Sequence, residues 1–196
     1  MMIDAKLVAQ LREMTGAGMM DAKKSLEGTN GDLTAAAEAL RAKGLAKAAS
    51  KSDRATKEGR VFSYIHSNGK LGAMVEVLCE TDFVARNEAF TELCHDLAMH
   101  ISAADPLYVK REDVPAEVVA KEREIYAAEM AEQAKPAEIV EKIVEGKLNK
   151  YFSDVCLLEQ PFIKDEDTTV DEFVKAKIAT IGENIQVSRF SRFQIG

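Results

Sequence analysis

Apolar residues recur at helical spacing in the first part of the chain. Leu7, Leu11 and Met14 fall on one face of a first predicted helix, which ends at the stretch "TGAG". A second helix is expected over residues 19–27, because the pattern resumes there and stops at "GTNG".

A third helix is predicted from the stretch "LTAAAEALRAK". Asn30 or Asp32 can cap its first turn, and Gly44 is expected to end it. Three helices of this length predict a small bundle over residues 1–45, which is marginally stable alone because it buries little surface. The next segment, 46–60, has no large apolar residue and is rich in Ala and Lys, so we expect a linker that is helical at first.

A β-hairpin is the next predicted element. Phe62, Tyr64 and His66 alternate onto one face of its first strand. Asn68-Gly69 follows, the preferred pair for a two-residue type I′ turn. The second strand has small or apolar residues at every other position: Leu71, Ala73, Val75, Val77 and Cys79.

The remaining periodic segments predict mainly helices. Residues 88–103 form one helix, with a buried stripe at helical spacing: Phe90, Leu93, Leu97 and Ile101. Two further helices are expected to form a hairpin over about 115–152. They break near "AKPAE", where Pro136 suits the first turn of the second helix.

The last part of the chain predicts one more helix and a strand. The stretch "LLEQPFIKD" reads as extended, and a helix follows it and ends at Gly182. Ile185 and Val187 then fall on one face of a final strand. We predict an α+β protein in which residues 61–196 form a core domain, a small antiparallel sheet flanked by helices.

Composition narrows the class of function. The chain has 196 residues, of which 46% are apolar and 30% charged, so it can bury a substantial core. A protein that binds nucleic acid mainly by electrostatics is normally basic, whereas this chain carries a net charge of −7. No direct nucleic-acid binding is therefore expected.

The cysteines and the apolar runs suggest a cellular compartment. Cys79, Cys94 and Cys156 are odd in number, widely spaced and without a CxxC pair, which favours a reducing environment over a disulfide framework. The N-terminal stretch lacks a signal pattern, and no apolar run reaches the ~20 residues of a membrane span. We expect a cytoplasmic protein with no membrane partner.

Catalytic, metal and nucleotide sites are weakly supported. His95 and His100 are five residues apart, so they do not share a helix face as a ligand pair would. Cys94 and His95 point about 100° apart on a helix, which makes a thiol–imidazole pair improbable. The stretch "TGAG" lacks the Lys-Ser/Thr of a phosphate-binding loop. We expect no enzyme activity, no metal and no cofactor.

Four basic residues have the spacing of a single helical stripe. Such a stripe can follow a phosphate backbone, which keeps an RNA-binding module open as an alternative. Interspersed acidic residues favour instead an ordinary solvated face. The four residues are Lys43, Lys47, Lys51 and Arg54.

The stretch "TDFV" is the strongest candidate for function. It lies where the second hairpin strand should give way to a helix. In one interpretation Phe83 folds back onto the core and Asp82 caps the helix. In the other, Phe83 is an exposed aromatic anchor of the kind found at interaction hot spots. The residues alone leave both open.

Four blocks of the sequence resemble elongation factor Ts of bacteria. They occur in the family's order: "LREMTGAGMMDAKKSL" (11–26), "YIHSNGKLGAMVEVLCETDFVARN" (64–87), "LLEQPFIKD" (157–165) and "IGENIQVSRFSRF" (181–193). The resemblance implies guanine-nucleotide exchange on GDP-bound elongation factor Tu, without covalent chemistry. It also implies that residues 1–45 resemble a ubiquitin-associated domain. Long members carry two copies of the core; this chain carries one, which implies a homodimer in a two-plus-two complex.

The resemblance also assigns roles to particular residues. Thr81, Asp82, Phe83 and Val84 match the motif that enters the partner's nucleotide domain and dislocates its magnesium.

Further residues are assigned to partner binding. Arg12, Met19 and Met20 are expected to dock on the same partner, although Met19 and Met20 could equally belong to the bundle core. Arg86 and Asn87 are expected to fix the junction that follows the motif.

Overall fold

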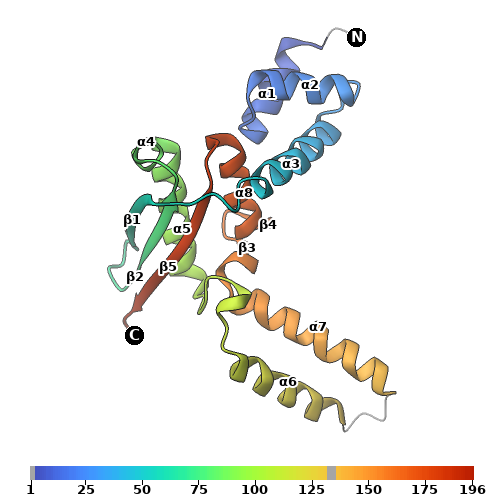
Figure 1. Cartoon of the computed structure of the whole chain (residues 1–196), viewed down its shortest axis with the longest axis vertical. Coiled ribbons are helices and arrows are strands. Elements are labelled where there is room, and N and C mark those ends of the chain that lie inside the picture. The colour runs from blue at the N-terminus through green and yellow to red at the C-terminus, as the bar shows by residue number, and fades with distance from the viewer. Residues whose placement is uncertain (1–2, 132–135) are drawn as a thin grey trace. The chain divides into compact units, whose positions relative to one another are not determined.

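The computed structural model describes residues 3–131 and 136–196 (Figure 1). The chain divides into two compact units, each formed by segments distant in sequence. The first unit comprises Met1–Arg60, Val77–Cys94 and Glu172–Gln186. The second comprises Val61–Glu76, His95–Asp171 and Val187–Gly196.

The first unit begins with the predicted three helices: α1 (Ala5–Thr15), α2 (Met19–Gly28) and α3 (Leu33–Ala49) (Figure 1). Of the two candidate caps for α3 it is Asp32 that serves, since its side chain accepts from the Ala35 N–H at 3.0 Å. The three helices share a buried cluster formed by Val8, Leu11, Ala22, Leu26 and Ala36.

Gly44 does not end the third helix, contrary to the sequence prediction. α3 continues to Ala49, and Gly44 is buried within it. A Cβ atom at this position would lie 3.4 Å from the Cβ of Ala179 in α8 (Val170–Ile181). The glycine therefore allows a close approach between two helices rather than a helix stop. The proposed domain boundaries at residues 45 and 60 remain a prediction.

The small antiparallel sheet confirms the predicted α+β class. It has the strand order β1-β2-β5, formed by β1 (Glu58–Ile65), β2 (Leu71–Cys79) and β5 (Ile185–Gln194) (Figure 1). The helix α5 (Glu88–Ala104) carries the predicted stripe, and all four of its members are fully buried. Contacts in both units join α5 to β1: the Arg60 guanidinium donates to the Thr91 hydroxyl, and the His95 ring meets the Phe62 and Tyr64 rings edge-on.

The turn between β1 and β2 is not the predicted type I′ turn. Such a turn needs positive φ at both central residues, but Gly69 (φ 65°) has it and Asn68 does not. The Gly69 N–H donates to the His66 carbonyl oxygen at 2.8 Å, and the Asn68 side chain accepts from the Lys70 N–H at 2.9 Å. The side-chain bond stabilises a longer connection, which the dipeptide alone did not reveal.

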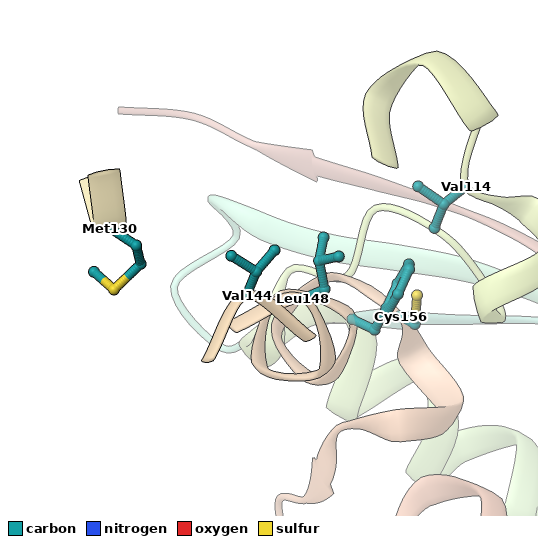
Figure 2. Packing of buried hydrophobic residues seen from close by; sticks show 6 residues of the cluster. Val114, Met130, Val144, Leu148 and Cys156 are labelled. Carbon is teal, nitrogen blue, oxygen red and sulfur yellow. The ribbon is translucent and has the colours of Figure 1, made fainter. Parts of the chain in front are cut away.

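The second unit contains the predicted helical hairpin. After the short helix η1 (Arg111–Asp113), α6 (Ala116–Ala131) and α7 (Ala137–Val155) lie side by side (Figure 1). Pro136 directly precedes α7, while the rest of the predicted break falls partly on residues 132–135, outside the described part. Figure 2 shows Val144 and Leu148 projecting from the same side of α7. These two residues belong to a buried hydrophobic cluster that comprises Val114, Met130, Val144, Leu148, Phe152 and Cys156.

The segment after α7 is only partly extended. It begins with the 3₁₀ helix η2 (Leu157–Glu159) and continues into a two-stranded sheet of β3 (Pro161–Phe162) and β4 (Asp165–Thr169). His100 of α5 holds this segment: its Nε2 lies 3.0 Å from the Gln160 Oε1, and its Nδ1 accepts from the Ile163 N–H at 3.2 Å. Burial lowers the pKa of His100, so the neutral ring is a structural link.

Candidate functional site

The "TDFV" stretch forms a helix of its own between β2 and α5. This helix, α4 (Asp82–Ala85), is a single turn. Its N-cap is Thr81, whose hydroxyl accepts from the Val84 N–H at 3.4 Å. The interpretation in which Asp82 caps the helix is wrong, because Asp82 already lies in the first turn and pairs with Arg86 at 3.0 Å.

Phe83 points into solvent from this turn. Its side chain is 83% exposed, the highest value among the exposed large apolar residues of the described chain. Ala85, two residues on, is buried and anchors the inner side of the turn. Folding back of Phe83 onto the core, the alternative left open by the sequence, does not occur in this structure.

Asn87 starts the helix that follows. Its side chain accepts from the Ala89 N–H at 2.8 Å, and its carbonyl oxygen accepts from the Thr91 N–H at 3.0 Å. The chain therefore passes from α4 into α5 with a defined direction. The role of Asn87 in partner binding remains a prediction.

Glu183 is a residue of this site that sequence reasoning missed. Its carboxylate, just beyond the end of α8, accepts from the backbone N–H groups of Glu80 and Thr81 at 3.1 and 3.0 Å. The Thr81 hydroxyl donates to the same carboxylate at 2.6 Å. The partners are about a hundred positions apart in the sequence, so no local pattern could have joined them.

Asn184, the next residue, joins three segments of the first unit. Its backbone N–H donates to the Glu80 carboxylate at 2.6 Å. Its side-chain amide donates to the carbonyl oxygens of Ser52 and Arg54 at 3.2 and 2.8 Å. Because the residue is buried and its polar groups are bonded, the backbone next to Glu183 is itself held in place.

The predicted docking residues of the N-terminal bundle lie at its surface. Met19 and Met20 are 61% and 62% exposed, so they do not belong to the bundle core, and Met14 is exposed as well. The Arg12 side chain is exposed and its Nε donates to the Ala17 carbonyl oxygen at 3.2 Å. The bundle therefore displays flexible apolar side chains, which suit an adaptable interface.

The four residues of the basic stripe contact acceptors within the chain. Lys43 and Lys47 approach the Asp21 carboxylate at 2.7 and 3.1 Å, and their hydrogen bonds, led by that of Lys43, hold the pKa of Asp21 below its usual value. The others contact Gly182 and Glu80: the Lys51 ammonium donates to the Gly182 carbonyl oxygen at 2.7 Å, and Arg54 lies 3.5 Å from the Glu80 carboxylate. These contacts weaken the case for a phosphate-binding stripe.

The thiols are poorly suited to catalysis. Cys94 is fully buried, and burial raises the pKa of its thiol to about 12. Burial likewise raises the pKa values of Cys79 and Cys156 to about 11. A thiol must ionise to act as a nucleophile, so the alternative of a cysteine enzyme gains no support.

Within residues 3–131 and 136–196, no group of three metal-ligating side chains comes together. No helix in that part of the chain is both long enough and apolar enough to cross a membrane.

Comparison with known proteins identifies the family. The sequence profile described as "Elongation factor TS" matches residues 45–196. Elongation factor Ts of Thermosipho melanesiensis is 55% identical over 195 residues, covering all of both chains. The chain belongs to the elongation factor Ts family. Two other elongation factor Ts proteins span the whole chain and most of their own length: that of Geobacter sulfurreducens (55% identical, 91% of its length) and that of Carboxydothermus hydrogenoformans (56%, 90%).

Membership of the elongation factor Ts family gives the site its context. It supports a role in translation elongation and in nucleotide exchange in general, and it implies an interaction with elongation factor Tu. The family profile begins at residue 45, so the N-terminal bundle is covered by the full-length relatives and not by the profile.

Proposed function

We propose that this chain binds GDP-bound elongation factor Tu and releases GDP by inserting Phe83 beside the partner's magnesium site. The observation that carries this proposal is the geometry of α4: a large apolar ring is held in solvent on a turn whose other side is anchored. A soluble protein gains nothing in stability from such a ring, whereas buried aromatic anchors dominate many interfaces.

The partner's hold on its nucleotide defines what the chain must do. Magnesium bridges the phosphates and the protein, and backbone N–H groups surround the phosphates. A nanomolar dissociation constant corresponds to ~12 kcal/mol, so spontaneous release is slow. An exchange factor breaks no covalent bond. It binds more tightly to the partner conformation in which the metal and phosphate contacts are lost.

Phe83 and Asp82 have different roles in this proposal. Protein interiors are close-packed, so a ring inserted between two elements displaces them as units. The Asp82 carboxylate is available for new contacts because its pair with Arg86 is largely exposed, and such pairs contribute only ~0–1 kcal/mol. It can accept hydrogen bonds from groups that orient the metal's ligands.

The same energetics explain how the factor leaves. A coupling of ~4 kcal/mol between factor and nucleotide accelerates release by about a thousandfold if all of it lowers the barrier. By thermodynamic linkage, bound nucleotide weakens the factor's affinity by the same free energy that the factor removes from nucleotide binding. The chain therefore dissociates when new nucleotide binds.

This function is tested by the release of fluorescent GDP from purified elongation factor Tu. The chain should accelerate release, with a rate that saturates as its concentration rises. Release that proceeds at the spontaneous rate at all concentrations of the chain would contradict the proposal.

The N-terminal bundle supplies a second docking surface in this proposal. Replacing both Met19 and Met20 with serine removes two exposed apolar side chains without touching the bundle core. We expect this variant to have a roughly tenfold higher half-saturating concentration and a maximal release rate within about twofold of the original. The reason is that the bundle contributes to binding the partner, whereas Phe83 contributes to releasing the nucleotide. Exposed Ile139 of α7, changed to serine, is the matched control. An unchanged half-saturating concentration for the double serine variant would exclude Met19 and Met20 from partner binding.

We also propose that two copies of the chain associate through the sheet. The open face of the sheet carries four exposed apolar side chains, together called here the sheet face: Val61, Ile65, Met74 and Phe193. Neighbouring strand residues point the other way: Phe62 and Tyr64 contact His95, Val75 is buried, and Arg192 donates to the Ser102 carbonyl oxygen. A single-core chain needs a second core for a two-plus-two complex, and a second copy offers the same apolar face.

Sedimentation measures this association directly. At micromolar concentration the chain should sediment as a dimer, and Phe193→Asp should shift it toward the monomer, because the sheet face would then bury an unpaired charge. A monomeric unmodified chain at that concentration contradicts the proposed dimer.

A further inference from the structure

The one-turn helix α4 cannot hold Phe83 in place by itself. Forming a first helical turn fixes several residues for a single hydrogen bond, so an isolated turn is unstable in water. Its own supports are modest: the capping bond from Val84 to Thr81 is long at 3.4 Å, and the Asp82–Arg86 pair is exposed. Something outside the turn must fix its start.

Glu183 makes the strongest contacts to that start. Its carboxylate accepts three hydrogen bonds, two from consecutive backbone N–H groups and one from the Thr81 hydroxyl. Hydrogen bonds to an ionised carboxylate are stronger than those between neutral groups. The three bonds fix the residue that caps α4, and therefore the direction in which the turn leaves β2.

The backbone next to Glu183 is also held in place, through Asn184. The buried Asn184 bonds Glu80 through its backbone and the carbonyl oxygens of Ser52 and Arg54 through its side chain. Glu80 thus receives a bond from Asn184 and donates one to Glu183. Hydrogen bonds therefore run in both directions between the junction from β2 to α4 and the junction from α8 to β5. Each junction supplies a backbone N–H and a carboxylate to the other.

We propose that Glu183 is a positioning residue for nucleotide exchange, which fixes the direction of Phe83 by clamping Thr81. This inference rests on the proposed function of Phe83. Glu183 acts on the partner only through the orientation of α4. Loss of the clamp leaves the ring present but free to adopt unproductive orientations, so the maximal rate falls while docking through the N-terminal bundle persists.

The test measures fluorescent GDP release from elongation factor Tu over a range of concentrations of the full chain. Glu183→Ala should lower the maximal rate about tenfold and leave the half-saturating concentration within about twofold. Glu183→Gln, which keeps one carbonyl acceptor and the side-chain volume, should give an intermediate rate. Glu145→Ala removes an equal charge from an exposed position on α7 and should change neither quantity.

A double variant separates positioning from direct contact. In a chain that already carries Phe83→Ala, adding Glu183→Ala should lower the maximal rate by less than about twofold, because no ring remains to orient. An unchanged rate for Glu183→Ala, or an equal loss in both backgrounds, would overturn the inference. Thermal unfolding of Glu183→Gln and Glu183→Ala shows whether each is folded at the assay temperature; if only the glutamine variant is folded, its rate decides.

The outcomes also separate this inference from the proposed function. If the unmodified chain does not accelerate release, the proposed function fails and the inference falls with it. If it does accelerate release and Phe83→Ala is slow, but both Glu183 variants retain the full rate, only the positioning role is excluded.

Discussion

Replacing Phe83 with alanine is expected to slow the maximal rate of stimulated GDP release by one to two orders of magnitude. This corresponds to ~1.4–2.8 kcal/mol of lost transition-state stabilisation. The physical reason is that alanine on α4 still forms the turn but has no volume with which to displace elements of the partner. The measurement is release of fluorescent GDP from elongation factor Tu at saturating concentrations of the variant.

The same variant should fold normally, because an 83% exposed side chain contributes little to stability. Leu107→Ala, which removes another exposed apolar side chain, serves as the control and should release GDP at the original rate. An unchanged maximal rate for Phe83→Ala would exclude insertion of the Phe83 ring as the cause of GDP release, even if the chain proves to be an exchange factor.

Replacing Phe90 with alanine should lower the stability of the fold and leave the exchange rate of the folded chain nearly unchanged, the reverse of what we expect for Phe83→Ala. Phe90 lies seven residues further on, in α5, and is fully buried. Deleting a buried phenyl ring removes its transfer free energy and leaves a cavity, at a cost of about 3–5 kcal/mol. We expect the free energy of unfolding to fall by that amount, measured by urea denaturation with an unchanged m value.

Exchange by the folded fraction of Phe90→Ala should stay within about twofold of the original at a temperature where the variant is folded. Phe83→Ala is the matched comparison, since the same ring is deleted from an exposed position of the same unit. A loss of less than 1 kcal/mol for Phe90→Ala would contradict the assigned core.

Local periodicity explains what the sequence could predict. Every other residue of β2 and every third or fourth residue of α5 is apolar, and most of those residues are buried, such as Val75, Val77 and Leu97. Burial drives both patterns, so the α+β class followed from the chain alone. The motif around Phe83 was found by its odd position at a strand–helix junction, and family resemblance supplied its meaning.

The parts that could not be predicted depend on distant partners. Gly44 is typical of a helix end by its residue type, and only the fold shows that it allows close approach to Ala179. The turn at Asn68 is stabilised by a hydrogen bond from the Lys70 N–H to the Asn68 side chain, which the dipeptide Asn-Gly does not reveal. Glu183 reads as an ordinary acidic residue after a helix end. Only the fold brings its carboxylate to Thr81, so the residue that orients the site carried no local signal.

We propose that Phe83 releases GDP by disturbing the partner's magnesium site. The most direct test measures stimulated release of fluorescent GDP at a saturating concentration of the chain, with millimolar magnesium and with the metal removed by a chelator. We expect the acceleration due to the chain to be several-fold smaller without magnesium, because part of the barrier that the ring lowers is then already absent. An acceleration of equal size in both conditions would contradict this role of Phe83.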